Sequence, residues 1–439
     1  MARSIVSALA VAIGLAAAGL APAAQAAETK TSEPRACPDG LPKDARCFAG
    51  QDASGAFYWI AVPANWNGTL VVHAHGGPRT GKPALDDEIE DLQRFAVMVQ
   101  EGYAWAGSTY RRGGYGVRMA AEDTDNLRKL FWAEFGKPKR TILHGQSWGG
   151  NVAAKASELY AYDADGGKNY DGVLLTSGVL AGGTRAYAFR ADLRAVYQYY
   201  CANHPRPDEP AYPLWRGLPA DSKMTRAELK SRVQACTGVD SPAAQRTPEQ
   251  QRRLSNILAA TGVAERQLQS HLAWATFLFQ DLVQHRLDGR NPFDNAEVRY
   301  RGTTDDKALN AGVQRFSADP AAVTRLAYDA DLTGQIALPT LTVHGIDDPV
   351  ASVRHEAAYR DVVAAAGRSQ LLVQTFVDEA EHSQLATPQY AALLRALSAW
   401  IETGEKPTPA GVDRLCREHD VTGEGCRFKP DYTPKPLER

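Results

Sequence analysis

The sequence carries almost no net charge, because 49 lysine and arginine residues are balanced by 51 aspartate and glutamate residues among its 439 residues. A nucleic-acid or anionic-membrane partner is therefore not expected, since a neutral surface attracts neither. The cysteines show no CxxC spacing, which gives little support to a zinc or thioredoxin-like site, and we expect neither a metal nor a cofactor. Hydrophobic residues make up 44% and charged residues 23%, which excludes a disordered or fibrous chain.

Beyond the N-terminus the sequence also lacks an apolar run long enough to cross a membrane. At the N-terminus, Arg3 precedes an apolar run over residues 5–20, and Ala24-Gln25-Ala26 follows it. This is the pattern of a secretory signal peptide with its cleavage site. We predict a signal peptide over residues 1–26 and a secreted or periplasmic mature protein without stable membrane insertion. The alternative is an uncleaved membrane anchor, which the cleavage pattern disfavours.

The cysteines agree with export. All six lie beyond the predicted cleavage site, in three local couples: Cys37 with Cys47, Cys201 with Cys236, and Cys416 with Cys426. Six cysteines allow 15 connectivities, and we expect the local one because each couple flanks a loop-like stretch containing proline or glycine. Reduced, buried cysteines are the alternative, which an oxidising compartment disfavours.

Short apolar segments alternate with helical patterns through the first part of the chain. Strand-like runs occupy residues 57–63, 69–73, 103–110, 140–144 and 173–177, and helical spacing occurs over residues 120–135 and 150–160. This alternation predicts an α/β fold with a mostly parallel central sheet and helices on both faces.

The alternation stops near Gly183, and the following segment is helical in pattern and rich in charge. Strand-like runs resume at residues 338–344 and 371–377, with helices expected at 352–366 and 389–401. We therefore predict a first core segment over residues 27–182, a helical cap insertion over 183–335, a second core segment over 336–404 and a Pro-rich tail with a local disulfide over 405–439. The insertion is long enough to be a domain in itself.

Gly145-Gln146-Ser147-Trp148-Gly149 is a GxSxG sequence between a predicted strand and a predicted helix. A serine at such a tight turn projects its hydroxyl at the C-terminal end of the strand. The N-terminus of the following helix favours negative charge there. Ser147 is therefore the candidate nucleophile, and an ordinary glycine-rich turn is the alternative.

A serine nucleophile needs a base, and the base needs an orienting acid. His382 follows the last predicted strand, and Asp348 lies in a loop after the strand before it. Ligands bind at the C-terminal ends of strands in such sheets. We predict His382 as the base and Asp348 as the acid, with the adjacent Asp347 as a competitor.

The negatively charged oxygen formed during acyl transfer needs amide donors. The backbone N–H of Trp148 is one candidate. The other is Gly77, with Gly76 second, because both follow an early strand. His73 and His75 lie in the same segment, but two histidines alone do not make a metal site.

Together, HGGP at residues 75–78, GxSxG with tryptophan after the serine, HGxxD at residues 344–348 and the late loop histidine resemble the α/β-hydrolase superfamily. The first two details resemble its proline-iminopeptidase-like branch, which usually carries a helical cap at this insertion point. The resemblance covers residues 55–180 and 336–402 and implies an α/β-hydrolase fold. This chain has Arg79 where the branch commonly has a further glycine. It has Gln146 where tannase-like and feruloyl esterases often have cysteine.

Candidate pocket residues are Gly76, Tyr110, Arg111 and Gln146, with the arginine available to bind a carboxylate. A solvated loop whose glycines simply permit a turn is the alternative for the segment of Tyr110 and Arg111. Trp274 lies on an aromatic helix-like stretch of the insertion. Such stretches more often form the core of a cap than a substrate-contacting wall.

The sequence favours an exported carboxylic-ester hydrolase that works through an acyl-enzyme on a small-molecule or polymeric ester. An exopeptidase of the proline-iminopeptidase type is the alternative, and it would need a cap carboxylate such as Asp208, Glu209 or Asp281 to bind a free amine. A non-catalytic binding protein on a hydrolase scaffold is the third hypothesis. The oligomeric state is left open.

Overall fold

The computed structural model describes Met1 and residues 32–420, 423 and 425–437. Apart from Met1, the predicted signal peptide lies outside these residues. Within the described part of the chain, no helix has both the length and the apolar character that crossing a membrane requires.

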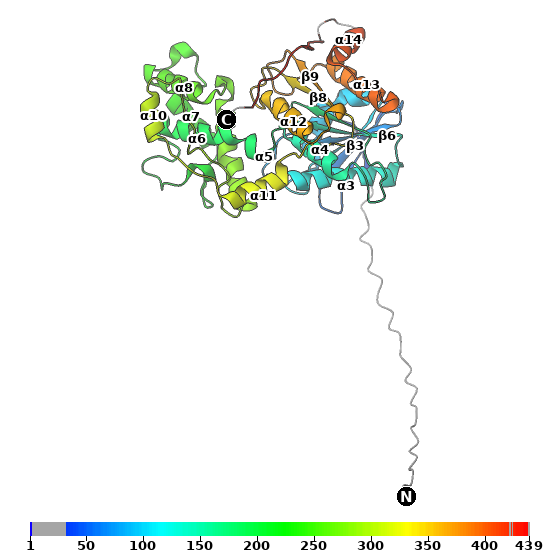
Figure 1. Cartoon of the computed structure of the whole chain (residues 1–439), viewed down its shortest axis with the longest axis horizontal. Coiled ribbons are helices and arrows are strands. Elements are labelled where there is room, and N and C mark those ends of the chain that lie inside the picture. Colours follow the sequence, from blue (N-terminus) through cyan, green and yellow to red (C-terminus); the bar gives the residue numbers. More distant parts are fainter. Residues whose placement is uncertain (2–31, 421–422, 424, 438–439) are drawn as a thin grey trace.

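One mixed sheet runs through the part of the molecule drawn on the right in Figure 1, with the strand order β1-β2-β3-β5-β4-β6-β7-β8-β9. The pairings from β5 through to β9 are parallel, and the pairings among β1, β2, β3 and β5 are antiparallel. The strands are β1 (Glu33–Arg35), β2 (Arg46–Gln51), β3 (Phe57–Val62), β4 (Thr69–Ala74), β5 (Ala104–Ser108), β6 (Arg140–Gln146), β7 (Gly172–Thr176), β8 (Thr340–Gly345) and β9 (Leu372–Val377). The predicted fold class, a mostly parallel sheet, is confirmed.

Helices cover both faces of the sheet, and alternate residues of each strand enter two separate apolar cores. Val72 and Leu143 pack in the core that includes α3 and α4, whereas Val71 and Ile142 pack in the core that includes α2 and α13. Both faces of the central strands are therefore buried, as a parallel sheet requires. The helices of this part are α1 (Ile89–Arg94), α2 (Ala96–Gln100), α3 (Val117–Phe135), α4 (Trp148–Tyr160), α12 (Arg354–Ala365), α13 (Thr387–Thr403) and α14 (Pro409–His419).

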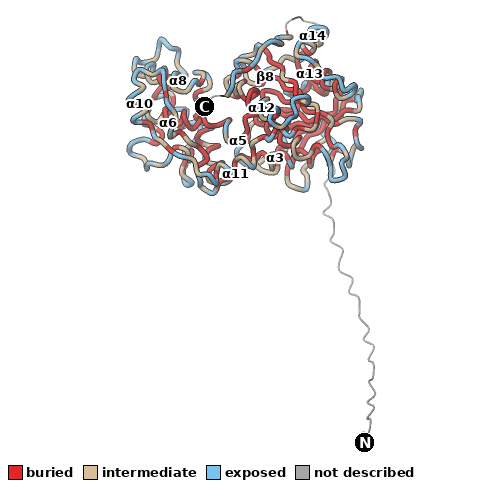
Figure 2. Tube along the Cα trace, viewed as in Figure 1, coloured by how far each residue is buried: buried red, intermediate tan, exposed pale blue. Residues whose placement is uncertain are grey.

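Residues 183–335 contain helices and loops without a strand, and we call this segment the cap. Most of its helices form a lobe beside the sheet (Figure 1) with buried residues inside it (Figure 2), and these residues are continuous with the core that includes α3 and α4. The helices between β7 and β8 are α5 (Gly182–Arg185), α6 (Ala188–Cys201), α7 (Arg226–Thr237), α8 (Pro248–Thr261), α9 (Leu268–Ala273), α10 (Asp306–Gly312) and α11 (Pro320–Ala330).

Local sequence signals set the ends of some of the cap helices. Thr247 and Gln250 form a capping box at the start of α8, where Pro248 is the first helical residue, and Gly262 ends the helix in the left-handed conformation. These residues satisfy the free amides and carbonyls at the helix ends. The ends of α8 are therefore defined by its own sequence, whereas α6 and α9 begin without a side-chain cap.

The C-terminal tail is more ordered than its proline content predicts. Thr408 caps α14 by accepting a hydrogen bond from the amide of Gly411, and Phe428 then forms an antiparallel bridge with Val377 of β9. The tail thus covers part of the last strand of the sheet, whose open edge would otherwise be a site for aggregation. Helix α14 was not expected in this segment.

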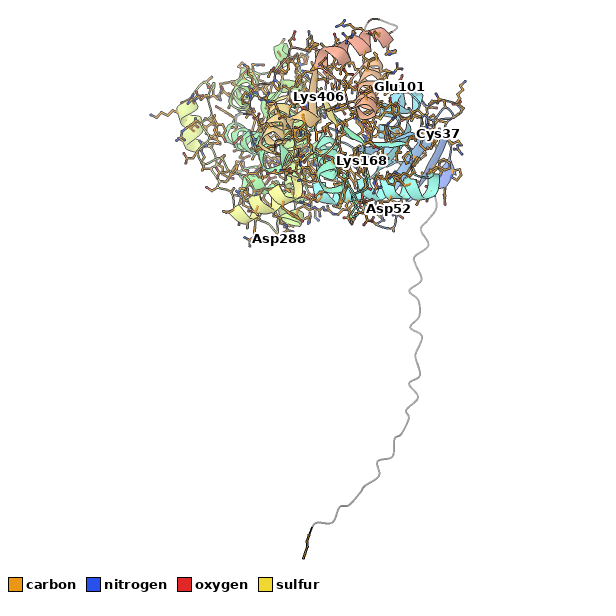
Figure 3. The ribbon with its side chains drawn as sticks, turned by 45° about the vertical axis from the view of Figure 1, so that its right-hand side comes forward. Cys37, Asp52, Glu101, Lys168, Asp288 and Lys406 are labelled. Atoms are coloured by element: carbon orange, nitrogen blue, oxygen red, sulfur yellow. A yellow bond between two sulfur atoms is a disulfide. The ribbon has the colours of Figure 1, made fainter. Side chains whose placement is uncertain are left out.

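Three disulfides join the six cysteines in the local couples described above. Cys37 lies at the outer side of the core, beside the N-terminal strands (Figure 3). Cys201 and Cys236 link the end of α6 to the end of α7. The cap therefore contains one covalent link between two of its helices.

Removing the cap disulfide should destabilise the protein more than removing the N-terminal one. Cys201 and Cys236 are 35 residues apart, and Cys37 and Cys47 are 10 residues apart. The loop-entropy relation assigns about 4 kcal/mol to the longer loop and about 1 kcal/mol less to the shorter one. Urea unfolding of the two double alanine variants measures this difference, and equal losses of unfolding free energy would contradict the expectation.

Candidate active site

Ser147 lies at the turn between β6 and α4 with φ 57° and ψ −123°, a conformation that non-glycine residues rarely adopt. Two flanking glycines make this turn sterically feasible. A Cβ on Gly145 would lie 2.2 Å from the carbonyl oxygen of Gly149, and a Cβ on Gly149 would lie 2.0 Å from that of Ala74. The GxSxG sequence is therefore needed for backbone packing at the end of the strand.

Ser147 and His382 are joined to Asp348 by a chain of hydrogen bonds. The distance from Ser147 Oγ to His382 Nε2 is 2.8 Å, and that from His382 Nδ1 to Asp348 Oδ2 is 2.7 Å. The other carboxylate oxygen of Asp348 accepts from the amides of Val350 at 2.9 Å and Ala351 at 3.0 Å. The carboxylate is thus held in one orientation toward the imidazole.

The structure distinguishes the two adjacent aspartates. Asp348 is buried, with 8% of its surface exposed, whereas Asp347 is exposed and takes no part in the chain of hydrogen bonds. Burial alone would raise the pKa of Asp348, but the hydrogen bond from His382 and the nearby imidazoles lower it below its ordinary value. Asp348 is therefore ionised at neutral pH and suited to hold a protonated His382.

The serine turn follows a central parallel strand, and the acid and the histidine lie on the loops after β8 and β9. A serine at a strand-to-helix turn, followed along the chain by its Asp and then its His partner, is characteristic of the α/β-hydrolase fold. The chain has the α/β-hydrolase fold. The predicted resemblance to the α/β-hydrolases is confirmed at this level, and membership of the proline-iminopeptidase-like branch stays a prediction.

The chain is similar to a few known proteins, either over a short stretch of sequence or in structure at low identity. No family model matches the chain. A stretch of 120 residues is 28% identical to a protein named o-phthalyl amidase from Xanthobacter agilis, and it covers 27% of this chain and 25% of that protein. The match thus spans about a quarter of the amidase.

Several solved structures are similar to the chain at low identity. Feruloyl esterase B from Aspergillus oryzae is 15% identical, with 87% of this chain and 89% of that chain covered and a TM-score of 0.44. An esterase from the bacterial hormone-sensitive lipase family is 14% identical, with 88% and 86% covered and a TM-score of 0.41. A rice cell wall degrading esterase from Xanthomonas oryzae is 14% identical, with 76% and 83% covered and a TM-score of 0.38.

The predicted amide donors lie beside Ser147 in this hydrolase fold. Trp148 is the first residue of α4, so its N–H has no acceptor within the helix. Gly77 has φ +69° in a turn closed by a 2.9 Å hydrogen bond from Arg79 N to Gly77 O. Gly76 packs against Gln146, whose side-chain oxygen would lie 2.2 Å from a Cβ at this position. The loop after β4 and the serine turn therefore fit closely together.

A cavity of about 310 Å³ opens at the serine turn. Six of the predicted site residues line it: Gly76, Gly77, Gln146, Ser147, Trp148 and His382. The amide nitrogen of Gln146 donates to Ser383 Oγ, which connects the serine turn to the loop that carries the histidine. Sequence analysis gave no role to Ser383.

Two predicted pocket residues do not line this cavity. Arg111 forms ion pairs with Asp123 at 2.5 Å and with Glu122 at 3.0 Å on α3. Tyr110 is buried, with its ring stacked on that of His75 at 4.2 Å. The acidic side chains of α3 are thus the reason that Arg111 is not available for a carboxylate in the cavity.

Three other arginines line the cavity: Arg79, Arg94 and Arg190. The rings of Tyr187 and Trp274 also line it, and they stack on each other at 4.4 Å. The expectation that Trp274 belongs to the cap core is therefore wrong in part, because one side of this residue faces the cavity. Arg190 lies on α6 within the cap, and nothing in the helical pattern of that segment singles it out.

Residues of the cap hold the loop that carries Asp348. His271 Nε2 lies 2.9 Å from the carbonyl oxygen of Pro349, and Arg190 Nε donates to His271 Nδ1 at 3.1 Å. Burial, together with the charge of Arg190, lowers the pKa of His271 to about 3. The imidazole is therefore neutral, with its proton on Nε2, and it donates to Pro349.

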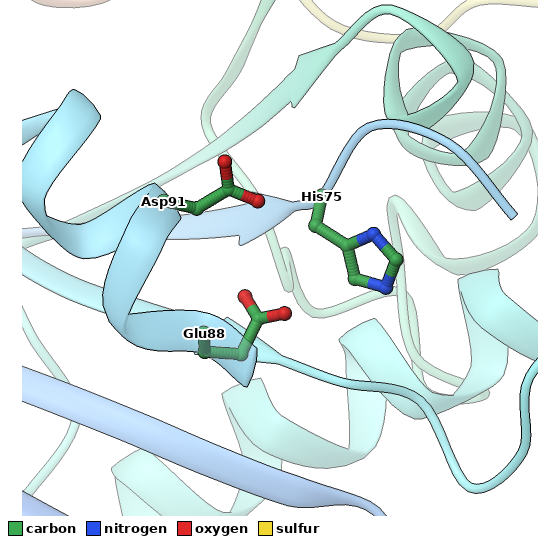
Figure 4. A group of neighbouring side chains, drawn as sticks. All are labelled: His75, Glu88 and Asp91. Atoms are coloured by element: carbon green, nitrogen blue, oxygen red, sulfur yellow. The ribbon is translucent and has the colours of Figure 1, made fainter. Parts of the chain in front are cut away.

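Arg79 belongs to a buried ion-pair cluster beneath the loop after β4. His75 follows β4, while Glu88 and Asp91 come from the adjoining short helices (Figure 4), and ligand atoms of these three residues lie within 4.8 Å of one another. Arg79 binds Glu88 at 2.9 Å and Asp91 at 3.2 Å. Its guanidinium therefore bridges the two acidic side chains and ties the loop that contains Gly77 to the core.

Replacing Arg79 with methionine should destabilise the protein strongly. The side chains of Glu88 and Asp91 are 0% and 3% exposed. Without Arg79, Asp91 keeps only the imidazole of His73, at 3.6 Å, as an ion-pair partner, and removing one partner of a buried ion pair costs about 3–5 kcal/mol. Arg94→Met is the matched control, because Arg94 pairs with Glu90, whose side chain is 68% exposed. We expect that control to lose at most about 1 kcal/mol of unfolding free energy. Equal losses in urea unfolding would refute the interpretation.

Proposed function

We propose that this protein is an exported serine hydrolase that cleaves carboxylic esters through an acyl-enzyme. The hydrogen-bonded chain of Ser147, His382 and Asp348 is the observation that carries this proposal. Ser147 Oγ attacks the ester carbonyl carbon while His382 takes the hydroxyl proton, and Asp348 stabilises the resulting imidazolium. His382 then gives the proton to the leaving alcohol as the carbon–oxygen bond breaks. A water molecule, deprotonated by His382, then attacks the acyl-enzyme in the same way, and the acid leaves as the bond to Ser147 Oγ breaks.

The amides of Trp148 and Gly77 stabilise the negatively charged oxygen in this proposal. Both residues line the cavity with Ser147, and donors fixed before the reaction need no reorganisation when charge develops. The close packing of Gly76 against Gln146 supports the same geometry, because it fixes the loop relative to the serine turn.

The cap residues that an exopeptidase would use are already engaged elsewhere. Glu209 is bound by Arg232, and Asp281 pairs with Arg286 and accepts from the amide of Tyr115. Neither these two nor Asp208 lines the cavity. Glu90 and Asp91 do line the cavity, but they pair with Arg94 and Arg79. A free N-terminal amine would therefore find no unpaired carboxylate among the described residues of the cavity, so we favour ester over peptide hydrolysis.

Amide hydrolysis is the second candidate function. The observation that favours it is the stretch of 28% identity with a protein named o-phthalyl amidase. The same three residues can expel an amine in place of an alcohol. The signal-peptide pattern and the three disulfides support export in either case.

Side-by-side hydrolysis of p-nitrophenyl esters and aminoacyl p-nitroanilides tests the proposal. We expect turnover of esters, with Ser147→Ala lowering kcat by at least about 10,000-fold. Turnover that depends on a free amine would favour the exopeptidase, and turnover of N-acylated anilides would favour the amidase. Ester turnover that persists in Ser147→Ala would reject the mechanism.

The two adjacent aspartates provide a matched pair of variants. Asp348→Asn should lower kcat by about 1,000- to 10,000-fold, because the amide cannot hold His382 in the required tautomer. Asp347→Asn should change kcat little, because Asp347 is exposed and does not contact His382. Steady-state kinetics with one ester decide between them, and a larger effect at Asp347 would reverse the assignment.

A further inference from the structure

Arg190 is a buried cation without an anionic partner. It is 5% exposed, and no carboxylate in the described part of the chain lies within ion-pair distance of it. Burial lowers its pKa to about 10, so it still carries its charge at neutral pH. Proteins rarely bury a charge that has no partner, because the cost of desolvation is not recovered.

The other two arginines of the cavity are already neutralised. Arg79 binds Glu88 and Asp91, and Arg94 binds Glu90. Arg190 therefore supplies the uncompensated positive charge among the arginines that line the cavity with Ser147.

The contacts of the Arg190 guanidinium leave one side of it available. Nε donates to His271 at 3.1 Å, and Nη2 lies 3.4 Å from the carbonyl oxygen of Val350, which is long for a hydrogen bond. Nη1 has no acceptor among the described residues. A planar guanidinium with two adjacent free or weakly bound nitrogens fits a carboxylate through two parallel hydrogen bonds.

We propose that Arg190 binds a carboxylate of the substrate, so that the enzyme acts on esters or amides that carry a second, ionised acid group. This inference rests on the proposed function and names the substrate class for the same site. The missing anion is then supplied by the substrate, and the charge of Arg190 becomes a source of specificity.

The walls beside Arg190 indicate the rest of the ligand. The guanidinium lies 4.6 Å from the centre of the Trp274 ring, and that ring stacks on Tyr187. These flat apolar surfaces suit the carbon skeleton of a small acid, and the cavity of about 310 Å³ limits its size. The substrate class is therefore a compact monoester or monoamide with one free carboxylate.

Arg190 could instead serve only to hold the Asp348 loop, through His271 and Val350. That role predicts equal loss of activity on charged and neutral substrates when Arg190 is replaced. The carboxylate-binding role predicts a much larger loss on the charged substrate than on the neutral one. The ratio of kcat/KM for a matched pair of substrates therefore separates the two.

Two matched pairs of substrates show whether the carboxylate belongs to the acyl side or to the alcohol side of the ester. For the acyl side, the pair is the p-nitrophenyl monoester of glutaric acid and its neutral carboxamide counterpart. For the alcohol side, it is meta-acetoxybenzoate and meta-acetoxybenzamide. We expect the wild type to prefer the charged member of one pair, and Arg190→Gln to lower kcat/KM for that member by about 100-fold relative to its neutral counterpart. Arg190→Lys should retain part of the preference, because lysine keeps the positive charge but lacks the two parallel N–H donors of the guanidinium.

Arg194→Gln is the matched control. Arg194 lies one turn further along α6, is fully buried and donates to Tyr212, and it does not line the cavity. Its replacement should lower thermal stability without changing the charged-to-neutral ratio. The inference is overturned if the wild type prefers the charged substrate in neither pair, or if Arg190→Gln leaves the charged-to-neutral ratio of kcat/KM unchanged. Either result leaves the esterase proposal intact.

Binding of the free acids tests Arg190 independently of turnover. Titration calorimetry of glutarate and meta-hydroxybenzoate with Ser147→Ala should show binding of one of them, and adding Arg190→Gln should abolish it. Binding that survives this change, or binding of neither acid, would reject the carboxylate site. If the free acids bind but the wild-type protein hydrolyses no ester or amide, the proposed reaction is rejected and the carboxylate site stands.

Discussion

The site depends on the close contact between the backbone of Gly149 and the loop that follows β4. At this contact the first turn of α4 passes the carbonyl groups of Ala74 and His75 without room for a Cβ. The same contact brings together the strained serine turn and the glycines that follow β4, which come from adjacent parallel strands. The proposed nucleophile and its proposed amide donors are thus placed by one backbone contact and need no further ordering. The interaction therefore sets the geometry of the whole site.

Charge is arranged around this rigid centre in two ways. On the core side, Arg79 neutralises buried carboxylates and anchors the glycine loop. On the cap side, Arg190 and the neutral His271 hold the loop of Asp348, while the charge of Arg190 has no protein partner among the described residues. In our proposal the core thus supplies the reaction itself, and the cap supplies the charged group that discriminates among substrates.

The sequence predicts those site residues that lie next to one another along the chain. GxSxG and the loop after β4 are local patterns of this kind, and the alternation of strands and helices placed both at strand ends. Asp348 could not be separated from Asp347 by pattern, because only the folded loop buries one and exposes the other. Arg111 was assigned to the pocket incorrectly, since its partner Asp123 lies on a helix whose facing side the sequence does not reveal. Arg190 was missed because an arginine in a helical pattern ordinarily indicates a solvated side chain. Strand β1 was missed because its three residues, Glu33–Arg35, are all exposed and give no apolar signal. Strand β2 buries only Cys47 and Ala49, which are too small and too few to mark a strand in the sequence.

The hydrogen bonds between the cap and the Asp348 loop bear on how molecules enter and leave. Lifting the cap as a rigid lid would break the contacts of His271 and Arg190 with that loop and would uncover Asp348. A route that preserves these contacts is the opening of the cavity beside Ser147. A molecule that enters by this route without displacing the cap must have a cross-section small enough to pass the opening.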